Sequence, residues 1–139
     1  MTNSRFFLDT AYVIALLNLR DSYHKKARIW LSRIRSAQEI WTTEVVLAEI
    51  GNSLARSNRS AAVAFINSCY VTFNVRVVTV DRVLFRRGVE FYHSRNDKEW
   101  GLTDCISFIV MRDYGLIEAL TTDEHFQQAG FRAILLEES

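Results

Sequence analysis

Short apolar segments alternate with amphipathic helical ones along the whole chain. Residues 5–8 read as a first strand, and the stretch at 22–35 repeats Ala27, Trp30, Leu31 and Ile34 at helical spacing. Further strands are expected at residues 39–41, 75–80, 117–120 and 133–136, and further helices at 11–18, 43–57, 61–70, 83–93, 102–114 and 124–129. Such alternation predicts an α/β fold in three layers, with a central parallel sheet of about five strands covered by helices on both faces.

Length and composition agree with one globular unit. The chain has 139 residues, 49% of them hydrophobic and 24% charged, which favours a single domain over residues 1–139 with a real core. No apolar run approaches the roughly 20 residues that span a bilayer. The N-terminus enters an apolar strand at once, without the pattern of a signal peptide. Cys69 and Cys105 have no zinc-site spacing, so a cytoplasmic protein with no membrane segment is expected.

Four acidic residues stand where an expected strand ends or a helix begins or runs. Asp9 follows Phe6-Phe7-Leu8, Asp104 falls in the first turn of a helix, and Asp123 comes shortly after the strand at 117–120. Glu49 lies within a helix, beside a stripe of apolar side chains. Ligands of open parallel sheets bind beyond the carboxyl ends of the strands. Clustered carboxylates repel one another unless a cation lies among them, and oxygen ligands suit Mg²⁺ or Mn²⁺. This pattern suggests metal-assisted phosphodiester cleavage.

Each acid also has a simpler explanation. An aspartate at a helix start often has no role beyond a favourable interaction with the helix dipole, and this is an alternative for Asp104. A glutamate at the edge of an apolar stripe can simply reach water, as Glu49 could. Asp9 is the strongest single candidate, because a carboxylate directly after three apolar residues is costly to dehydrate without a partner.

The charges are distributed unevenly. The net charge is only +1, but without the four candidate acids 17 basic residues face 12 acidic ones. Fourteen of the basic residues are arginine, whose planar fork suits phosphate. An alternative interpretation is that these arginines belong to ordinary solvated helix faces. An acidic pocket in a basic surround would nevertheless suit a phosphate-backbone substrate.

Four stretches together resemble the PIN-domain nucleases, in the family's order and over essentially the whole chain. They are Phe7-Leu8-Asp9-Thr10, Ala48-Glu49, Glu99 to Phe108 and Leu120-Thr121-Thr122-Asp123-Glu124-His125-Phe126. The resemblance implies the PIN-like fold and a Mg²⁺- or Mn²⁺-dependent endoribonuclease, of the kind that acts as the VapC-like toxin of a toxin–antitoxin pair. It matches Asp9, Glu49, Asp104 and Asp123 to the family's acidic quartet. It also implies an RNA substrate, a cognate antitoxin protein and a homodimer. Gly101 departs from the serine that often caps the following helix in relatives.

The expected chemistry divides the four acids. Asp9 and Asp104 are expected to bind the metal directly, and Glu49 and Asp123 to complete the catalytic cluster or orient the attacking water. Thr10, Thr121 and Thr122 could hydrogen-bond these carboxylates. His125 is interpreted as an ordinary histidine, because the three histidines have no metal-ligand spacing.

Two other classes of protein are alternatives to a nuclease. A phosphoacceptor signalling domain also clusters aspartates at strand ends, but it needs a lysine after a late strand, and this chain has none there. A catalytically inactive PIN-like domain that binds RNA or acts as a scaffold is the remaining alternative. The intact set of four acids disfavours it.

Overall fold

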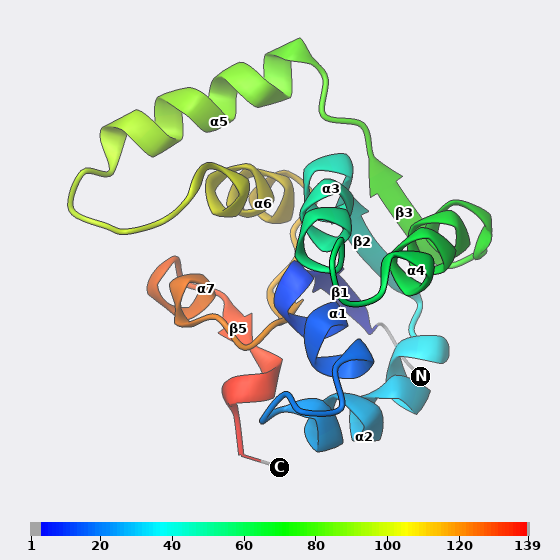
Figure 1. Ribbon diagram of the computed structural model, residues 1–139. Helices are drawn as coiled ribbons and strands as arrows, with labels where there is room; N and C mark the ends of the chain where they lie inside the picture. The colour runs from blue at the N-terminus through cyan, green and yellow to red at the C-terminus, as the bar shows by residue number, and fades with distance from the viewer. Residues whose placement is uncertain (1–3, 139) are drawn as a thin grey trace.

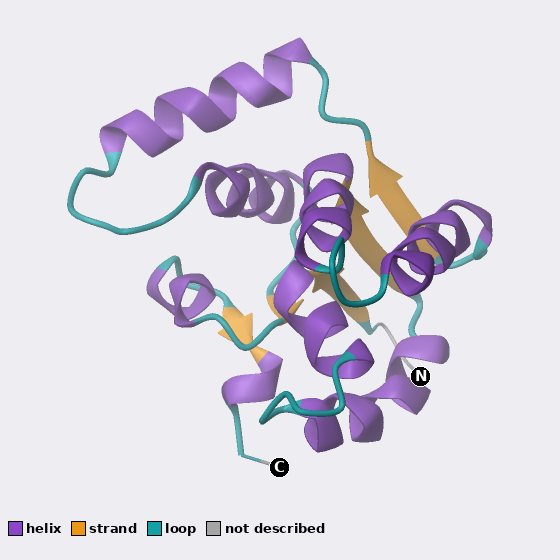
Figure 2. Ribbon diagram, in the orientation of Figure 1, coloured by secondary structure: helices purple, strands orange, loops and turns teal. Residues whose placement is uncertain are grey.

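The computed structural model describes residues 4–138 and is built on a five-stranded sheet. The strands are β1 (Arg5–Leu8), β2 (Glu39–Thr43), β3 (Val75–Val78), β4 (Glu118–Leu120) and β5 (Arg132–Ala133). They lie in the order β3-β2-β1-β4-β5, and each neighbouring pair runs parallel. The expected α/β class with a parallel sheet of five strands is therefore confirmed (Figure 2).

Helices connect the strands in two sets. The described helices are α1 (Thr10–Leu17), α2 (His24–Arg35), α3 (Glu44–Ser53), α4 (Arg59–Val71), α5 (Arg82–Ser94), α6 (Leu102–Asp113) and α7 (Glu124–Gln128). Helix α1 packs against α2 and α3, and α3 against α4, whereas α6 packs against α5 and α7 (Figure 1). Among residues 4–138, no helix is long and apolar enough to cross a membrane.

The connections leave β1 and its neighbour β4 in opposite directions across the sheet. The connections from β1 to β2 to β3 step one way across the sheet, and those from β3 to β4 to β5 step the other way. Because such parallel crossovers are almost always right-handed, the reversal puts α1 to α4 on one face and α5 to α7 on the other. Chain segments leaving β1 and β4 therefore diverge at the carboxyl edge of the sheet, which is where open α/β sheets bind ligands.

Helix α6 is the most deeply buried helix. All seven consecutive residues from Cys105 to Met111 are buried, so this helix has no solvent-exposed face through its middle. Phe108 packs edge-on against Trp100 and Phe126, with ring centroids 5.1 and 5.0 Å apart. Burial on all sides holds α6 rigidly, and with it the position of any side chain in its first turn.

Several boundaries differ from the sequence-based expectation: the helix expected at 43–57 ends at Ser53 and the strand expected at 75–80 ends at Val78, and two further differences have a clear physical cause. The last strand was expected at residues 133–136, but β5 is only Arg132–Ala133 and the chain continues as a 3₁₀ turn, Ile134–Leu136. Ile134 and Leu135 are buried there, so an apolar run that reads as a strand fills the core in another conformation. The second helix begins at His24 rather than Ser22, because Asp21 accepts a hydrogen bond from the amide of Tyr23 and forms a turn first.

Candidate active site

The four predicted acids line one cavity at the carboxyl edge of the sheet. The cavity has a volume of about 420 Å³ and opens to solvent. Its lining brings together residues that are far apart in the sequence and lie in or just before α1, α3, α6 and α7: Asp9, Thr10, Ala11, Glu49, Gly101, Leu102, Thr103, Asp104, Asp123 and His125. The structure thus places all four acids together, although their role in catalysis stays a prediction.

Asp9 lies at the floor of this cavity. It follows β1 directly, precedes the first residue of α1, and donates its amide to the carbonyl of Leu120 at 3.3 Å. The Thr121 hydroxyl donates a 2.7 Å hydrogen bond to Asp9 Oδ2. Only 6% of Asp9 is exposed, and this burial raises its pKa to about 7, against the hydrogen bond from Thr121 and with the help of the nearby charges of Asp104 and Asp123. A carboxylate in such a position becomes easier to ionise when a cation binds beside it.

Asp104 lies in the first turn of α6. Its Oδ2 accepts a 3.2 Å hydrogen bond from the amide of Gly101, the residue that precedes this helix. Burial raises the pKa of Asp104, and the hydrogen bond from His125 opposes that rise. Asp104 therefore stabilises the start of α6 and also lines the cavity. The two interpretations from the sequence, a helix-dipole residue and a residue of the site, do not exclude each other.

Asp123 caps α7 and faces Asp104 across the cavity. Its Oδ1 accepts a 2.9 Å hydrogen bond from the amide of His125, and its own amide donates 3.0 Å to the Thr121 hydroxyl. The side chain of Thr121 is thus bonded to both Asp9 and the turn that carries Asp123. The predicted contact between threonines and carboxylates is confirmed for Thr121.

Glu49 reaches the cavity from α3. The hydroxyl of Thr10 donates to Glu49 Oε1 at 2.9 Å, which turns the glutamate toward the start of α1. Helix α3 is itself anchored by Thr43, whose hydroxyl accepts from the amide of Val46 at 3.2 Å. The predicted hydrogen bond of Thr10 is therefore confirmed. The side chain of Thr122 makes no such bond among the interactions of the described residues.

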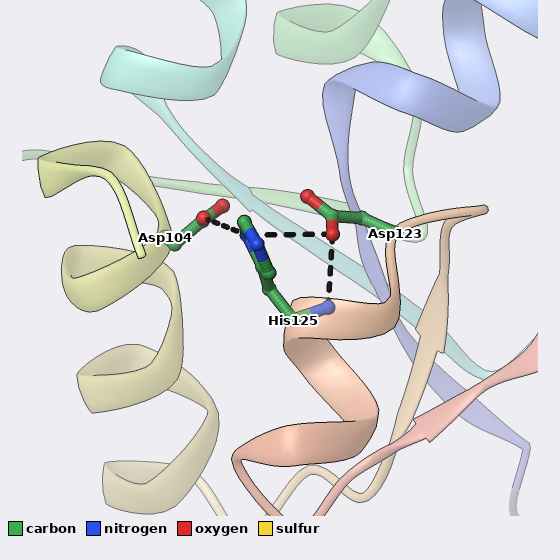
Figure 3. A group of neighbouring side chains, drawn as sticks. All are labelled: Asp104, Asp123 and His125. Atoms are coloured by element: carbon green, nitrogen blue, oxygen red, sulfur yellow. Dashed lines mark hydrogen bonds and ion pairs between the residues drawn. The ribbon is translucent and has the colours of Figure 1, made fainter. Parts of the chain in front are cut away.

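His125 is the residue that the sequence did not single out as functional. Its Nδ1 lies 3.0 Å from Asp104 Oδ2 and 3.4 Å from Asp123 Oδ1, between the two acids (Figure 3). Burial lowers its pKa, but the hydrogen bond that His125 donates to Asp104 and the charges of both acids outweigh this, so the net shift of the pKa is upward. The signals in the sequence are its place two residues after Asp123 and its position within one of the four stretches that resemble the PIN-domain nucleases.

Comparison with known proteins shows which family the chain belongs to. The PIN domain family matches residues 6–132. The chain belongs to the PIN domain family. A curated relative, the 23S rRNA-specific endonuclease VapC20 of Mycobacterium tuberculosis, is 32% identical over 128 residues, which are 90% of this chain and 94% of the relative.

Two solved structures have a similar fold. The crystal structure of Mycobacterium tuberculosis VapC20, a toxin that cleaves the sarcin-ricin loop, matches with a TM-score of 0.82 and 28% identity over 92% of this chain and 97% of that one. FitAcB from Neisseria gonorrhoeae matches with a TM-score of 0.60 and 15% identity, over 91% of this chain and 94% of that one. The FitAcB likeness supports the fold alone.

The donor set of this PIN domain fits a divalent cation. One ligand atom each from Asp104, Asp123 and His125 lie within 4.8 Å of one another, and Asp9 and Glu49 add carboxylates to the same cavity. Carboxylate oxygens at this density are the ligands that Mg²⁺ and Mn²⁺ prefer. The cavity can therefore hold a cation that offsets the mutual repulsion of its acids.

Proposed function

We propose that this PIN domain is a Mg²⁺- or Mn²⁺-dependent endoribonuclease and the toxin of a toxin–antitoxin pair. The observation that carries the proposal is the convergence of Asp9, Glu49, Asp104 and Asp123 on one cavity at the carboxyl edge of the sheet. We take the unit to be a single domain over residues 1–139, because one sheet and one continuous core run through the described chain.

The four acids have distinct proposed roles. Asp9 and Asp104 hold the metal, since a strand end and the start of a buried helix keep their oxygens in place. Glu49 and Asp123 complete the cluster and orient or deprotonate the attacking water. A divalent metal, when bound, lowers the pKa of that water and offsets the charge that develops on the phosphate in the transition state. Thr10 and Thr121 keep their carboxylates aimed into the cavity through hydrogen bonds of 2.9 and 2.7 Å.

RNA is the proposed substrate, and ribosomal RNA its proposed class. The support is the relative that is 32% identical, which is a 23S rRNA-specific endonuclease. The open cavity suits a polymer better than a small enclosed ligand, because a strand can lie across its mouth. Acting on such a substrate implies a cytoplasmic location.

Two protein partners complete the proposal, a cognate antitoxin and a second copy of the chain. The support for an antitoxin is the likeness to a toxin of known structure. The support for a homodimer is the exposed apolar surface at the end of α4, where Tyr70, Val71 and Phe73 are 55%, 83% and 92% exposed. Apolar side chains gathered in this way commonly mark interfaces.

Cleavage of a labelled RNA tests the proposed activity. The wild-type protein should cut internally with Mg²⁺ or Mn²⁺ and stop when EDTA is added. Asp9→Asn should abolish cutting, because the amide keeps the shape and loses the charge that holds the ion. Glu90→Gln is the matched control, since Glu90 is an exposed acid on α5 outside the cavity.

The same assay separates the alternative of an inactive RNA-binding or scaffold domain. That alternative requires RNA retention without cleavage in either metal, and an Asp9→Asn variant that binds RNA like the wild type. Full cleavage in EDTA would instead overturn metal dependence.

A further inference from the structure

His125 occupies the gap between two of the acids. Its ring nitrogen Nδ1 faces both Asp104 Oδ2, at 3.0 Å, and Asp123 Oδ1, at 3.4 Å. Ionised carboxylates only accept hydrogen bonds, so Nδ1 carries the proton and donates to them.

A cation shared by these two acids would need the same space. Mg²⁺ holds its oxygen ligands at about 2.0–2.1 Å and strongly prefers oxygen to nitrogen. An ion at that distance from both Asp104 Oδ2 and Asp123 Oδ1 would lie against a protonated nitrogen that is itself 3.0 and 3.4 Å from these oxygens. In this tautomer Nδ1 has no lone pair to offer a metal, so the ring in its present position and an ion shared by the two acids exclude each other.

The ring has a route out of this position. Its side chain is 25% exposed and lines the open cavity of about 420 Å³. The backbone of His125 is held independently, because its amide bonds to Asp123 Oδ1 at 2.9 Å. Rotation about the side-chain bonds can move the ring toward solvent while α7 stays in place.

We propose that His125 is a displaceable occupant of the metal pocket, which stabilises the metal-free site and leaves when a divalent cation bridges Asp104 and Asp123. This inference rests on the proposed metal-dependent function and adds a regulatory step to it. Two consequences follow from linkage. His125 stabilises only the metal-free protein, and the cost of displacing it weakens metal binding by the same free energy.

The test compares thermal unfolding of the wild type and His125→Ala in EDTA and in saturating Mn²⁺. His125→Ala should melt several degrees lower than the wild type in EDTA, and the difference should disappear in Mn²⁺. His93→Ala is the matched control, because His93 is exposed on α5 and lies outside the cavity. An equal loss in both conditions would mean an ordinary structural histidine and overturn the proposal.

Mn²⁺ binding measured by electron paramagnetic resonance supplies an independent readout. His125→Ala should bind Mn²⁺ roughly 3- to 10-fold more tightly, as expected for the loss of one competing hydrogen-bonded group. His125→Gln, which can still donate to the acids, should fall between it and the wild type. Unchanged or weaker binding by His125→Ala overturns the proposal, and weaker binding would make His125 a ligand instead.

RNA cleavage by the wild type keeps this inference separate from the proposed function. If the wild type binds Mn²⁺ and cleaves RNA while His125→Ala shows no change in metal affinity, only the inference fails. If the wild type neither binds Mn²⁺ nor cleaves RNA, the proposed function fails, and the displacement step fails with it.

Discussion

The hydroxyl of Thr121 donates a 2.7 Å hydrogen bond to Asp9, which lies 112 residues earlier in the chain. The same hydroxyl accepts a 3.0 Å bond from the amide of Asp123. One buried threonine after β4 thus ties the acid at the end of β1 to the turn that carries a second acid. Together with the pairing of β1 and β4, this side chain fixes the relative position of the two carboxylates.

Replacing Thr121 should disturb both stability and the site. Thr121→Val keeps the shape but leaves a buried carboxylate oxygen and a backbone amide without their partner. We expect the free energy of unfolding to fall by about 1–3 kcal/mol and RNA cleavage to drop strongly. Thr122→Val is the matched control from the adjacent position and should change both quantities little. Urea unfolding and a cleavage assay on the two variants check this, and equal effects would contradict the assignment.

The stability of the metal-free protein should depend on pH through Asp9. Its carboxyl group stays protonated up to about pH 7 in the folded state, against a reference pKa of 3.8. The folded state therefore binds more protons between these values, and the free energy of unfolding falls as pH rises through this window. Asp9→Asn should remove this component and be more stable than the wild type at pH 8, by about 1–3 kcal/mol.

Unfolding by urea in EDTA at pH 5 and pH 8 measures that dependence. The other titratable groups are common to both proteins, so the difference between wild type and Asp9→Asn isolates Asp9. A wild type that gains stability relative to Asp9→Asn on going from pH 5 to pH 8 would show that Asp9 is not held in its neutral form.

Asp104→Asn should separate helix capping from catalysis. Burial raises the pKa of Asp104, so removing its charge should stabilise the metal-free fold by about 1 kcal/mol or less. The gain should be smaller than for Asp9→Asn, because Asp104 keeps His125 as a partner. Activity should be lost, and Mn²⁺ should raise the melting temperature of the variant much less than that of the wild type. A residue that only served the helix start would leave the metal response intact.

Two helical glycines should respond in opposite directions to alanine. A Cβ on Gly88 would lie 2.5 Å from Ile106 Cγ1, at the contact between α5 and α6, whereas a Cβ on Gly51 would meet only Ile66 Cδ1 at 3.8 Å. Gly88→Ala should lower the free energy of unfolding by about 1–3 kcal/mol through overpacking. Gly51→Ala should raise it by about 0.4–1 kcal/mol, because the unfolded chain loses freedom. Thermal melts of both variants decide this, and a Gly88→Ala variant as stable as Gly51→Ala would contradict the close approach of the two helices.

Local patterns in the sequence were sufficient for the elements and for the four acids. Asp9, Asp104 and Asp123 follow strands or begin helices, and those positions converge in any parallel sheet. Glu49 was harder to place, because an acid at the edge of an apolar stripe can face water or a site. The hydrogen bond from Thr10 on α1 orients Glu49 toward the cavity. No local pattern in the sequence reveals a contact between two different helices.

The remaining features arise from contacts between distant segments. His125 acquires its position from Asp104, 21 residues earlier, so its own neighbours say nothing of the pairing. The strand predicted at residues 133–136 is wrong, because Ile134 and Leu135 are buried in a 3₁₀ turn. A buried turn and a buried strand give the same apolar run in the sequence. Periodicity over so few residues does not distinguish the two.

The placement of β4 in the sheet also has a consequence for synthesis on the ribosome. Asp9 is made long before β4, Thr121 and Asp123, which all lie beyond residue 117. Strand β4 pairs with β1, and Thr121 orients Asp9. A nascent chain that stops before β4 has three of the four acids. Its β1 can pair with β2 on one side but has no strand on the side where β4 belongs. The nuclease centre therefore cannot form before β4 and the turn after it have been made, and products truncated before β4 are expected to have no cleavage activity.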